Sequence, residues 1–368
     1  MNIKSLLIGS AAALAVVSGA QAADAVVAAE PEPMEYVRVC DAYGTGFFYI
    51  PGTETCLKIG GQIRYEKRVS RVGDGRTVYD NHSRIRIDFE AKNDSEWGTV
   101  YSWVRLQGDQ VNNGHDLAGS GDNSEVNFYY FFGIGGLEFG NWDSQWAKFF
   151  GYGGYTDDGG VYTTDWNYPD SRQYVSYTAD FGNFKAFVSL DNDADEHYQA
   201  RDLNGDLDFN DRNERGEWHN AKVNTASHQG RKWLPDISAG VSGTFGDYSA
   251  AAGIGYDESD ESFAIKKVVR GDIGMFSFAA MGLYSNSSEN IYFAYDGFSA
   301  LVGLSAKVTD TVTIAKDIQW FDNGDWRLVG DVNWQVANGF SVLVEGIYAN
   351  PDNGPDTKSG MLRFQRNF

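Results

Sequence analysis

The residues that could do chemistry in this sequence are mostly charged side chains at every second position. From 84 to 91 the chain reads Arg-Ile-Arg-Ile-Asp-Phe-Glu-Ala, and from 57 to 66 it reads Leu-Lys-Ile-Gly-Gly-Gln-Ile-Arg-Tyr-Glu. This period of two predicts strands with one apolar face and one charged face. The chemistry that such a charged face offers is electrostatic, because it attracts, repels or orients ions and polar molecules.

Motifs for covalent catalysis are absent from the sequence. A lipase-like barrel would have to present a serine and a histidine together, and no G-x-S-x-G motif occurs. All five histidines lie in or beside predicted loops: His82, His115, His197, His219 and His228. Walker A, Rossmann and H-E-x-x-H motifs are missing as well. We therefore expect that the protein is not an enzyme.

The two cysteines, Cys40 and Cys56, are the only ones in the chain. In an exported protein an even pair at short spacing predicts a disulfide, and the Gly and Pro residues between them allow the loop to close. A metal or redox role would need a C-x-x-C motif or a nearby histidine, and neither is present. The pair therefore predicts a structural bridge.

One segment, 202–217, has oxygen ligands at the spacing of a calcium loop. The first, third, fifth and twelfth places of an EF-hand-like pattern are taken by Asp206, Asp208, Asn210 and Glu217. The sixth place, which is normally Gly, is Asp211, and no flanking helices are evident. Calcium is thus one candidate and a solvated acidic surface loop is the other. No other cofactor is expected.

The N-terminus predicts export. Residues 1–22 contain a single basic residue, Lys4, then an apolar run from Leu6 to Val17, and they end with small residues at Ala20 and Ala22. This is the pattern of a cleaved signal peptide. The apolar run is too short to span a membrane as a helix, and no later stretch approaches the roughly twenty apolar residues that such a helix needs. The sequence therefore excludes a helical membrane protein.

Residues 23–56 are predicted to form a periplasmic N-terminal leader that ends in the disulfide loop. Its first part is rich in Ala, Glu and Pro and is not expected to contribute to a core. The formal net charge of the whole chain is −21. Because phosphate binding needs clustered Lys and Arg, this acidity argues against a nucleic-acid partner.

Residues 57–368 predict an all-β fold of about sixteen strands. Ten residues at about 3.3 Å each, tilted near 45°, span roughly 23 Å, close to the apolar band of an outer-membrane barrel. Tight turns alternate with breaks that are mostly longer, at 70–81, 108–124, 143–170, 192–235, 286–297 and 350–358. The last ten residues alternate too and are expected to pair with the first strand. This layout predicts a transmembrane antiparallel β-barrel with short periplasmic turns and long surface loops.

Both ends of the chain resemble a known family. Residues 36–61, Tyr-Val-Arg-Val-Cys-Asp-Ala-Tyr-Gly-Thr-Gly-Phe-Phe-Tyr-Ile-Pro-Gly-Thr-Glu-Thr-Cys-Leu-Lys-Ile-Gly-Gly, and residues 363–368, Arg-Phe-Gln-Arg-Asn-Phe, are similar to the alphaproteobacterial general porins of Brucella and Rhizobium relatives. The resemblance implies a homotrimer of sixteen-stranded outer-membrane barrels. Each barrel would be a water-filled pore for ions and small hydrophilic solutes, constricted by an inward-folded third surface loop at about 143–170.

In such a barrel, cations on the inner face would oppose carboxylates of the constriction loop. The predicted cations are Arg64, Arg84, Arg86, Arg105, Arg172, Lys185, Arg327 and Arg363, and the predicted loop carboxylates are Asp157, Asp158, Asp165 and Asp170. Opposed charges would set a transverse field that screens solutes by charge and dipole. The alternative is that these are simply solvated lumen residues. Because acidic surface loops enrich cations at the mouth, we expect a weak cation preference.

Two other functions fit the same fold. A substrate-specific channel would be favoured by an aromatic track, which Tyr101, Trp103, Tyr129 and Phe131 could form. An adhesive or structural surface barrel would place its binding residues in the long loops, including the acidic loop at about 192–235. For each of the three functions the expected surroundings are outer-membrane lipid and lipopolysaccharide.

Overall fold

The computed structural model describes residues 37–71, 75, 77–113, 123–151, 153–156, 172–192, 234–352 and 354–368. The chain divides into two units, Met1–Arg38 and Val39–Phe368, and all strands of the described residues lie in the second unit. In the described part of the chain, no helix is long and apolar enough to cross a lipid bilayer. The predicted signal peptide, residues 1–22, lies outside the described residues.

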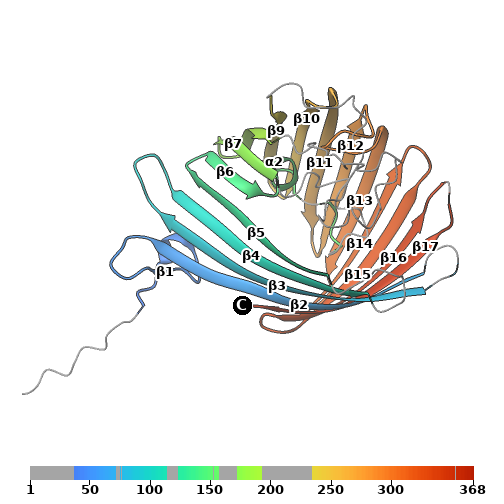
Figure 1. The fold of residues 1–368 in the computed structure, drawn as a ribbon, viewed down its shortest axis with the longest axis horizontal. Helices are drawn as coiled ribbons and strands as arrows, with labels where there is room; N and C mark the ends of the chain where they lie inside the picture. The colour runs from blue at the N-terminus through green and yellow to red at the C-terminus, as the bar shows by residue number, and fades with distance from the viewer. Residues whose placement is uncertain are drawn as a thin grey trace, which may run out of the picture. The chain divides into compact units, whose positions relative to one another are not determined.

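The second unit is a closed antiparallel β-barrel of sixteen strands (Figure 1). The strands follow one another in chain order around the barrel, and each pairs with both of its neighbours. They are β2 Cys56–Arg71, β3 Thr77–Asn93, β4 Val100–Asn113, β5 Asn123–Ile134, β6 Leu137–Trp142, β7 Arg172–Asp180, β8 Phe184–Asp191, β9 Asp236–Phe245, β10 Tyr248–Asp257, β11 Ser262–Ile273, β12 Phe276–Ser285, β13 Gly297–Lys307, β14 Val312–Phe321, β15 Trp326–Ala337, β16 Phe340–Asn350 and β17 Thr357–Asn367. The fold class predicted from the sequence is confirmed.

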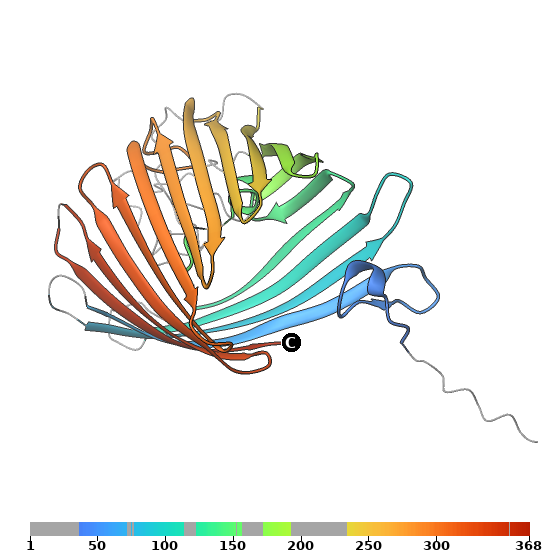
Figure 2. The same cartoon turned by 180° about the vertical axis from the view of Figure 1, so that it is seen from behind.

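The barrel closes where its last strand meets its first. β17 pairs antiparallel with β2, with Arg363 opposite Glu66, and Figures 1 and 2 both show the two strands side by side. Beyond β17, the backbone N–H of Gly61 donates to the Phe368 carbonyl (2.9 Å), and the Phe368 N–H donates to the Gly61 carbonyl (3.1 Å). A Cβ at Gly61 would lie 2.5 Å from Phe368 Cζ. The terminal aromatic residue therefore lies over a glycine of the first strand.

Strand register gives the barrel wall two unlike faces. Ile63 pairs with Ile85, and the two side chains are 50% and 53% exposed on the outer face. One residue further along, Arg64 pairs with Arg84 on the inner face. Because a side chain alternates sides at every residue, each strand presents apolar groups to lipid and mostly polar groups to the interior.

Two predicted loops are partly strand, so their predicted bounds are wrong. The segment 70–81 was expected to be a loop, but β2 continues to Arg71 and β3 begins at Thr77. The segment 108–124 is likewise shortened by β4 and β5. The polar residues of segment 70–81 resemble a loop in sequence, yet their backbones pair across the sheet, as Ser70 does with Val78. Backbone pairing here overrides side-chain polarity.

At the rim of the barrel opposite the long connections, tight turns join the strands, as predicted. The β5–β6 and β9–β10 turns contain Gly135 and Gly246, with φ of 57° and 64°. A two-residue hairpin turn needs such positive φ values, which glycine adopts without steric cost.

The disulfide is confirmed, and it closes a small lobe at the start of β2. Cys40 is bonded to Cys56, with their Cα atoms 6.0 Å apart. The lobe contains a single 3-10 turn, η1 (Asp41–Tyr43), and the two-residue strand β1 (Phe48–Tyr49), which pairs with the beginning of β2. The ammonium groups of Lys58 and Lys92 lie 5.7 and 5.3 Å from the ring centroid of buried Phe47. These contacts hold the lobe against β2 and β3.

Gly61→Val should impair barrel closure, because its side chain would occupy the space of the Phe368 ring at the β2–β17 seam. We expect a loss of about 1–3 kcal/mol in unfolding free energy, and less of the fast-migrating folded form on unheated SDS gels. Gly346→Val is the matched control, because nothing lies within 4 Å of a Cβ built there. Equal losses for the two variants would show that the seam has no special requirement for glycine.

Candidate functional site: the barrel interior

The five predicted cations nearest the seam lie together on the inner face. Arg64 lies on β2, Arg84 and Arg86 on β3, Arg105 on β4 and Arg363 on β17, which are four successive strands. More broadly, the inner face of β2–β4 carries more cations than carboxylates. The cations are Lys58, Arg64, Arg68, Arg84, Arg86, Lys92 and Arg105, and the carboxylates are Glu66, Asp80, Asp88, Glu90 and Asp109.

Glu66 is the centre of a charge network on this wall. Its fully buried carboxylate accepts from Arg363 Nε (2.6 Å) and from Arg68 (2.5 Å), and it contacts Arg64 at 3.3 Å. His82 Nδ1 lies 3.1 Å from the same carboxylate. Four neighbouring groups therefore converge on one acidic side chain, which was not among the predicted site residues. The signal for it was its place in the alternation of β2.

His82 links this carboxylate to a second one. Its Nε2 lies 2.9 Å from Asp109 Oδ1, and the same oxygen accepts from Arg84 Nε at 2.6 Å. Because both ring nitrogens face carboxylates, the imidazolium form of His82 is the one that can donate to both. The histidine was expected beside a loop but lies within β3.

The other three predicted cations lie apart from this wall. Arg172 on β7 is 4% exposed and forms an ion pair with Asp236 at 3.0 Å. Lys185 on β8 is exposed beside the β7–β8 turn and pairs with Asp180 at 2.9 Å. Arg327 on β15 lies opposite Gln319 in the register. The structure therefore groups five of the eight cations on one wall.

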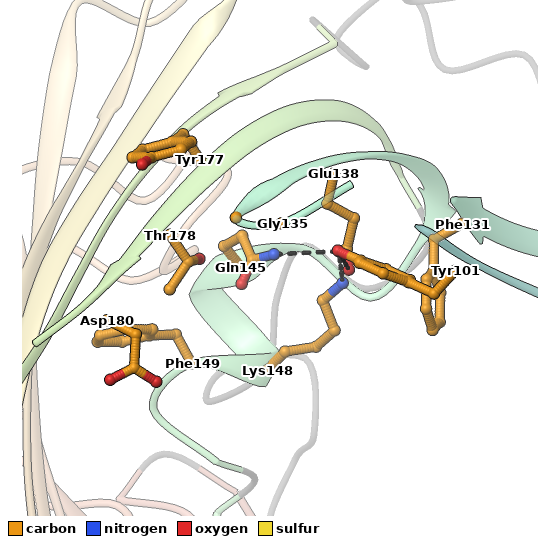
Figure 3. A pocket seen from close by; sticks show the side chains of 11 residues that line it. Tyr101, Phe131, Gly135, Glu138, Gln145, Lys148, Phe149, Tyr177, Thr178 and Asp180 are labelled. Carbon is orange, nitrogen blue, oxygen red and sulfur yellow. Dashed lines mark hydrogen bonds and ion pairs between the residues drawn. The ribbon is translucent and has the colours of Figure 1, made fainter. Parts of the chain in front are cut away.

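Directly after β6, the chain is hydrogen-bonded to the carboxylate of Glu138 on β6. Residues 143–151 and 153–156, here called the post-β6 segment, include the short helix α2 (Gln145–Lys148). Glu138 on β6 accepts from Lys148 Nζ (2.6 Å) and Gln145 Nε2 (3.1 Å), and also from the hydroxyls of Tyr101 and Tyr174. Figure 3 shows Lys148 and Gln145 directed toward Glu138 beside a cavity of about 560 Å³.

Aromatic residues of the post-β6 segment pack against glycines of the inner face. Trp146 is fully buried and Phe150 nearly so. A Cβ at Gly253 would lie 2.3 Å from Phe150 Cζ, and a Cβ at Gly240 would lie 2.6 Å from it. Neighbouring glycines on β9 and β10 thus leave room for this ring.

The end of the post-β6 segment is bonded to β14. Asp317 accepts the backbone N–H groups of Tyr155 (2.9 Å) and Thr156 (2.7 Å), and the Thr156 hydroxyl donates to it as well. The Tyr155 hydroxyl donates to the Phe278 carbonyl at 3.0 Å. Gly154 has φ of +67°, and a Cβ there would lie 2.2 Å from Asp317. The contact therefore requires glycine at 154.

The predicted loop carboxylates Asp157, Asp158, Asp165 and Asp170 lie outside the described residues, and so do the candidate calcium ligands Asp206, Asp208, Asn210 and Glu217. Among the residues that the structure does describe, no group of three or more His, Cys, Asp or Glu side chains could hold a metal ion.

The four aromatic residues of the predicted track do lie together. Trp103 stacks on Phe131 with centroids 5.1 Å apart, and Tyr101 is 6.2 Å from Phe131. Trp142 joins them, 5.0 Å from Trp103 and 4.8 Å from Tyr129. Sequence reasoning missed Trp142 as part of this group, although it ends β6 on the inner face opposite Arg172.

A family model described as a porin subfamily matches residues 24–363. The chain belongs to this porin family. It is 34% identical to Porin Omp2b of Brucella suis and 32% identical to Porin Omp2b of Brucella canis, each over the whole of both chains.

Solved porin structures share the fold at low sequence identity. The anion-selective porin from Comamonas acidovorans is 11% identical with a TM-score of 0.56, and it covers 86% of this chain and 100% of its own. Salmonella typhi OmpF, solved with daunomycin, is 7% identical with a TM-score of 0.58, and the match covers 86% and 98% of the two chains. These structures show the fold, and membership of the porin family shows that the chain is an outer-membrane channel protein and not an enzyme.

Glu66→Gln should destabilise the barrel, because the buried Arg363 guanidinium would keep its charge and lose this carboxylate. We expect the free energy of unfolding to fall by about 3–5 kcal/mol, measured by urea titration of tryptophan fluorescence in phospholipid vesicles. Glu90→Gln is the control on the same wall, because it removes a partly exposed partner of Lys92 and should cost less than about 1 kcal/mol. A small loss for Glu66→Gln would mean that the network adds little stability.

Proposed function

We propose that this porin is a general diffusion channel that the post-β6 segment narrows from inside. The observation that carries the proposal is the Asp317 contact. β6 and β14 are half the barrel apart, with the same number of strands between them in either direction. A segment that starts at one, contacts β9 to β12 on the way and bonds to the inner face of the other supports a path along the inside of the barrel, which narrows the lumen. The channel would admit ions and small hydrophilic solutes and exclude larger ones by diameter.

The charges of the interior support selection by electrostatics as well as by size. The cation-rich wall on β2–β4 faces a lumen that also holds the Asp317 carboxylate and, in our proposal, the carboxylates Asp157, Asp158, Asp165 and Asp170. Fixed charges of opposite sign on different walls order water and orient dipolar solutes. We propose the weak cation preference that the acidic surface loops predict, and we propose that the cation-rich wall on β2–β4 limits this preference.

A homotrimer embedded among lipopolysaccharide is the proposed assembly. The family resemblance of both chain ends supports it, together with an outer face on which apolar side chains such as Ile63 and Ile85 are about half exposed. Refolded protein that inserts into a planar bilayer would then show current steps in groups of three.

A substrate-specific channel is the second candidate, and the aromatic group from Tyr101 to Trp142 favours it. However, the Trp103 ring already contacts other side chains. Phe131 stacks on it, and the Arg105 guanidinium lies 4.8 Å from its centroid. Rings that pack on each other offer less surface to a solute, so we favour general diffusion. A solute that blocks the ion current saturably at low concentration would reverse this preference.

Asp317→Ala should increase single-channel conductance in planar bilayers, by up to about twofold, because the far end of the post-β6 segment loses its acceptor and the open cross-section widens. Asp331→Ala on the adjacent strand is the control, because it also removes a carboxyl group from the inner face but leaves that acceptor in place. Equal changes for both variants would show that charge, and not the position of the segment, sets the conductance. An unmodified protein that inserts without conducting would refute the diffusion channel.

Arg86→Gln should shift the reversal potential in a salt gradient toward stronger cation preference, because it removes a positive charge from the β2–β4 wall. Lys185→Gln is the control, since Lys185 is exposed at the β7–β8 turn and pairs with Asp180. We expect the control to leave the reversal potential almost unchanged. A larger shift for Lys185→Gln would place the selective charges at the periplasmic mouth.

A further inference from the structure

A second connection, the loop between β12 and β13 at residues 286–296, also packs on the inner face. Ile291, Tyr292 and Phe293 are at most 4% exposed, and they belong to one buried cluster with Trp146 and Phe150 of the post-β6 segment. Two connections that are far apart in sequence therefore share one apolar core inside the barrel.

Polar contacts fix this second loop to three different strands. The Tyr292 hydroxyl donates to Asp191 on β8 (2.8 Å), and the Ile291 N–H donates to Asp257 on β10 (2.8 Å). Asn290 Nδ2 donates to the Ser262 hydroxyl on β11 at 2.6 Å. Burial, with the neighbouring Asp191 carboxylate, raises the pKa of Tyr292 well above its usual range. The phenol therefore stays protonated and keeps donating to Asp191.

The inner row of β10 is shaped for both connections at once. Gly253 leaves room for the Phe150 ring of the post-β6 segment, and Gly255, two residues further on, leaves room for Tyr292. A Cβ at Gly255 would lie 2.4 Å from Tyr292 Cγ. Glycine within a strand weakens it unless another group needs the space, and here two aromatic rings do.

Trp146 is the contact between the two connections. Its ring centroid lies 5.3 Å from that of Tyr292 and 5.5 Å from that of Phe150. The Lys266 ammonium lies 5.7 Å from the Trp146 ring centroid and donates to the Trp146 carbonyl at 3.3 Å. The Tyr292 hydroxyl is hydrogen-bonded to Asp191, and its ring packs against Gly255. Because both contacts fix its position, Tyr292 forms a rigid surface on which Trp146 packs.

We propose that Tyr292 is a positioning residue of the channel, which holds Trp146 against the inner wall and so keeps the post-β6 segment in the lumen. This inference rests on the proposed function, in which that segment narrows the pore. The Glu138 and Asp317 contacts fix its two ends, whereas Tyr292 supports the apolar part between them. The width of the pore therefore depends on the β12–β13 loop as well as on the segment itself.

A double-mutant cycle with Tyr292→Ala and Trp146→Ala tests the proposal by single-channel conductance and by the size of polyethylene glycol that still enters the pore. Each single variant should raise the conductance by up to about twofold and admit larger polymers. The double variant should gain no more than the larger single effect, because the tyrosine acts through the tryptophan. Tyr292→Phe keeps the ring and should stay closer to the unmodified protein.

Folding of each variant is checked by its migration on unheated SDS gels. If Tyr292→Ala does not fold, Tyr292→Leu takes its place, because leucine keeps apolar volume but not the ring. Additive gains in the double variant would overturn the proposal. So would an unchanged conductance in Tyr292→Ala while Asp317→Ala still raises it, and that result would leave the proposed function intact. If neither variant changes the conductance, the narrowing role of the segment itself fails.

Discussion

Pairing of every backbone polar group is the constraint on which this structure depends. Hydrocarbon offers no water to an unpaired N–H or C=O, so a sheet that spans a membrane must have no open edge. The chain meets this condition at the β2–β17 seam, where the pairing continues past the last strand to Phe368. Closure then fixes which face of every strand is inside, because side chains alternate from that seam onward.

The inner face of the barrel is not polar everywhere. The inner rows of β11–β15 carry apolar side chains, among them Val268, Leu301 and Val329, all nearly or fully buried. Apolar groups that face a water-filled lumen would lose the stability gained by burial. The post-β6 segment and the β12–β13 loop cover them. The hydrophobic effect therefore holds these two connections against one side of the barrel.

Periodicity made the strands, their number and the seam predictable from the sequence, and the single pair of cysteines made the disulfide predictable. It could not show that Arg71 and Thr77 are paired strand residues, because polar residues occur both in loops and on inner faces. It also could not find the Glu66 network. Alternation shows which side of its own strand a residue faces, whereas a contact such as Arg363 to Glu66 depends on the register between strands almost three hundred residues apart in the chain.

The arginines of the inner face have two roles that the sequence could not separate. Arg363 and Arg172 are at most 4% exposed and form ion pairs with buried carboxylates, so they are packed structural ions and not solvated lumen residues. The side chains of Arg84 and Arg105 are partly exposed, at 23% and 15%, although each has a carboxylate partner. Passing solutes can reach partly exposed guanidinium groups such as these. The buried pairs contribute by holding the wall rigid, so that the charges facing the lumen keep fixed positions.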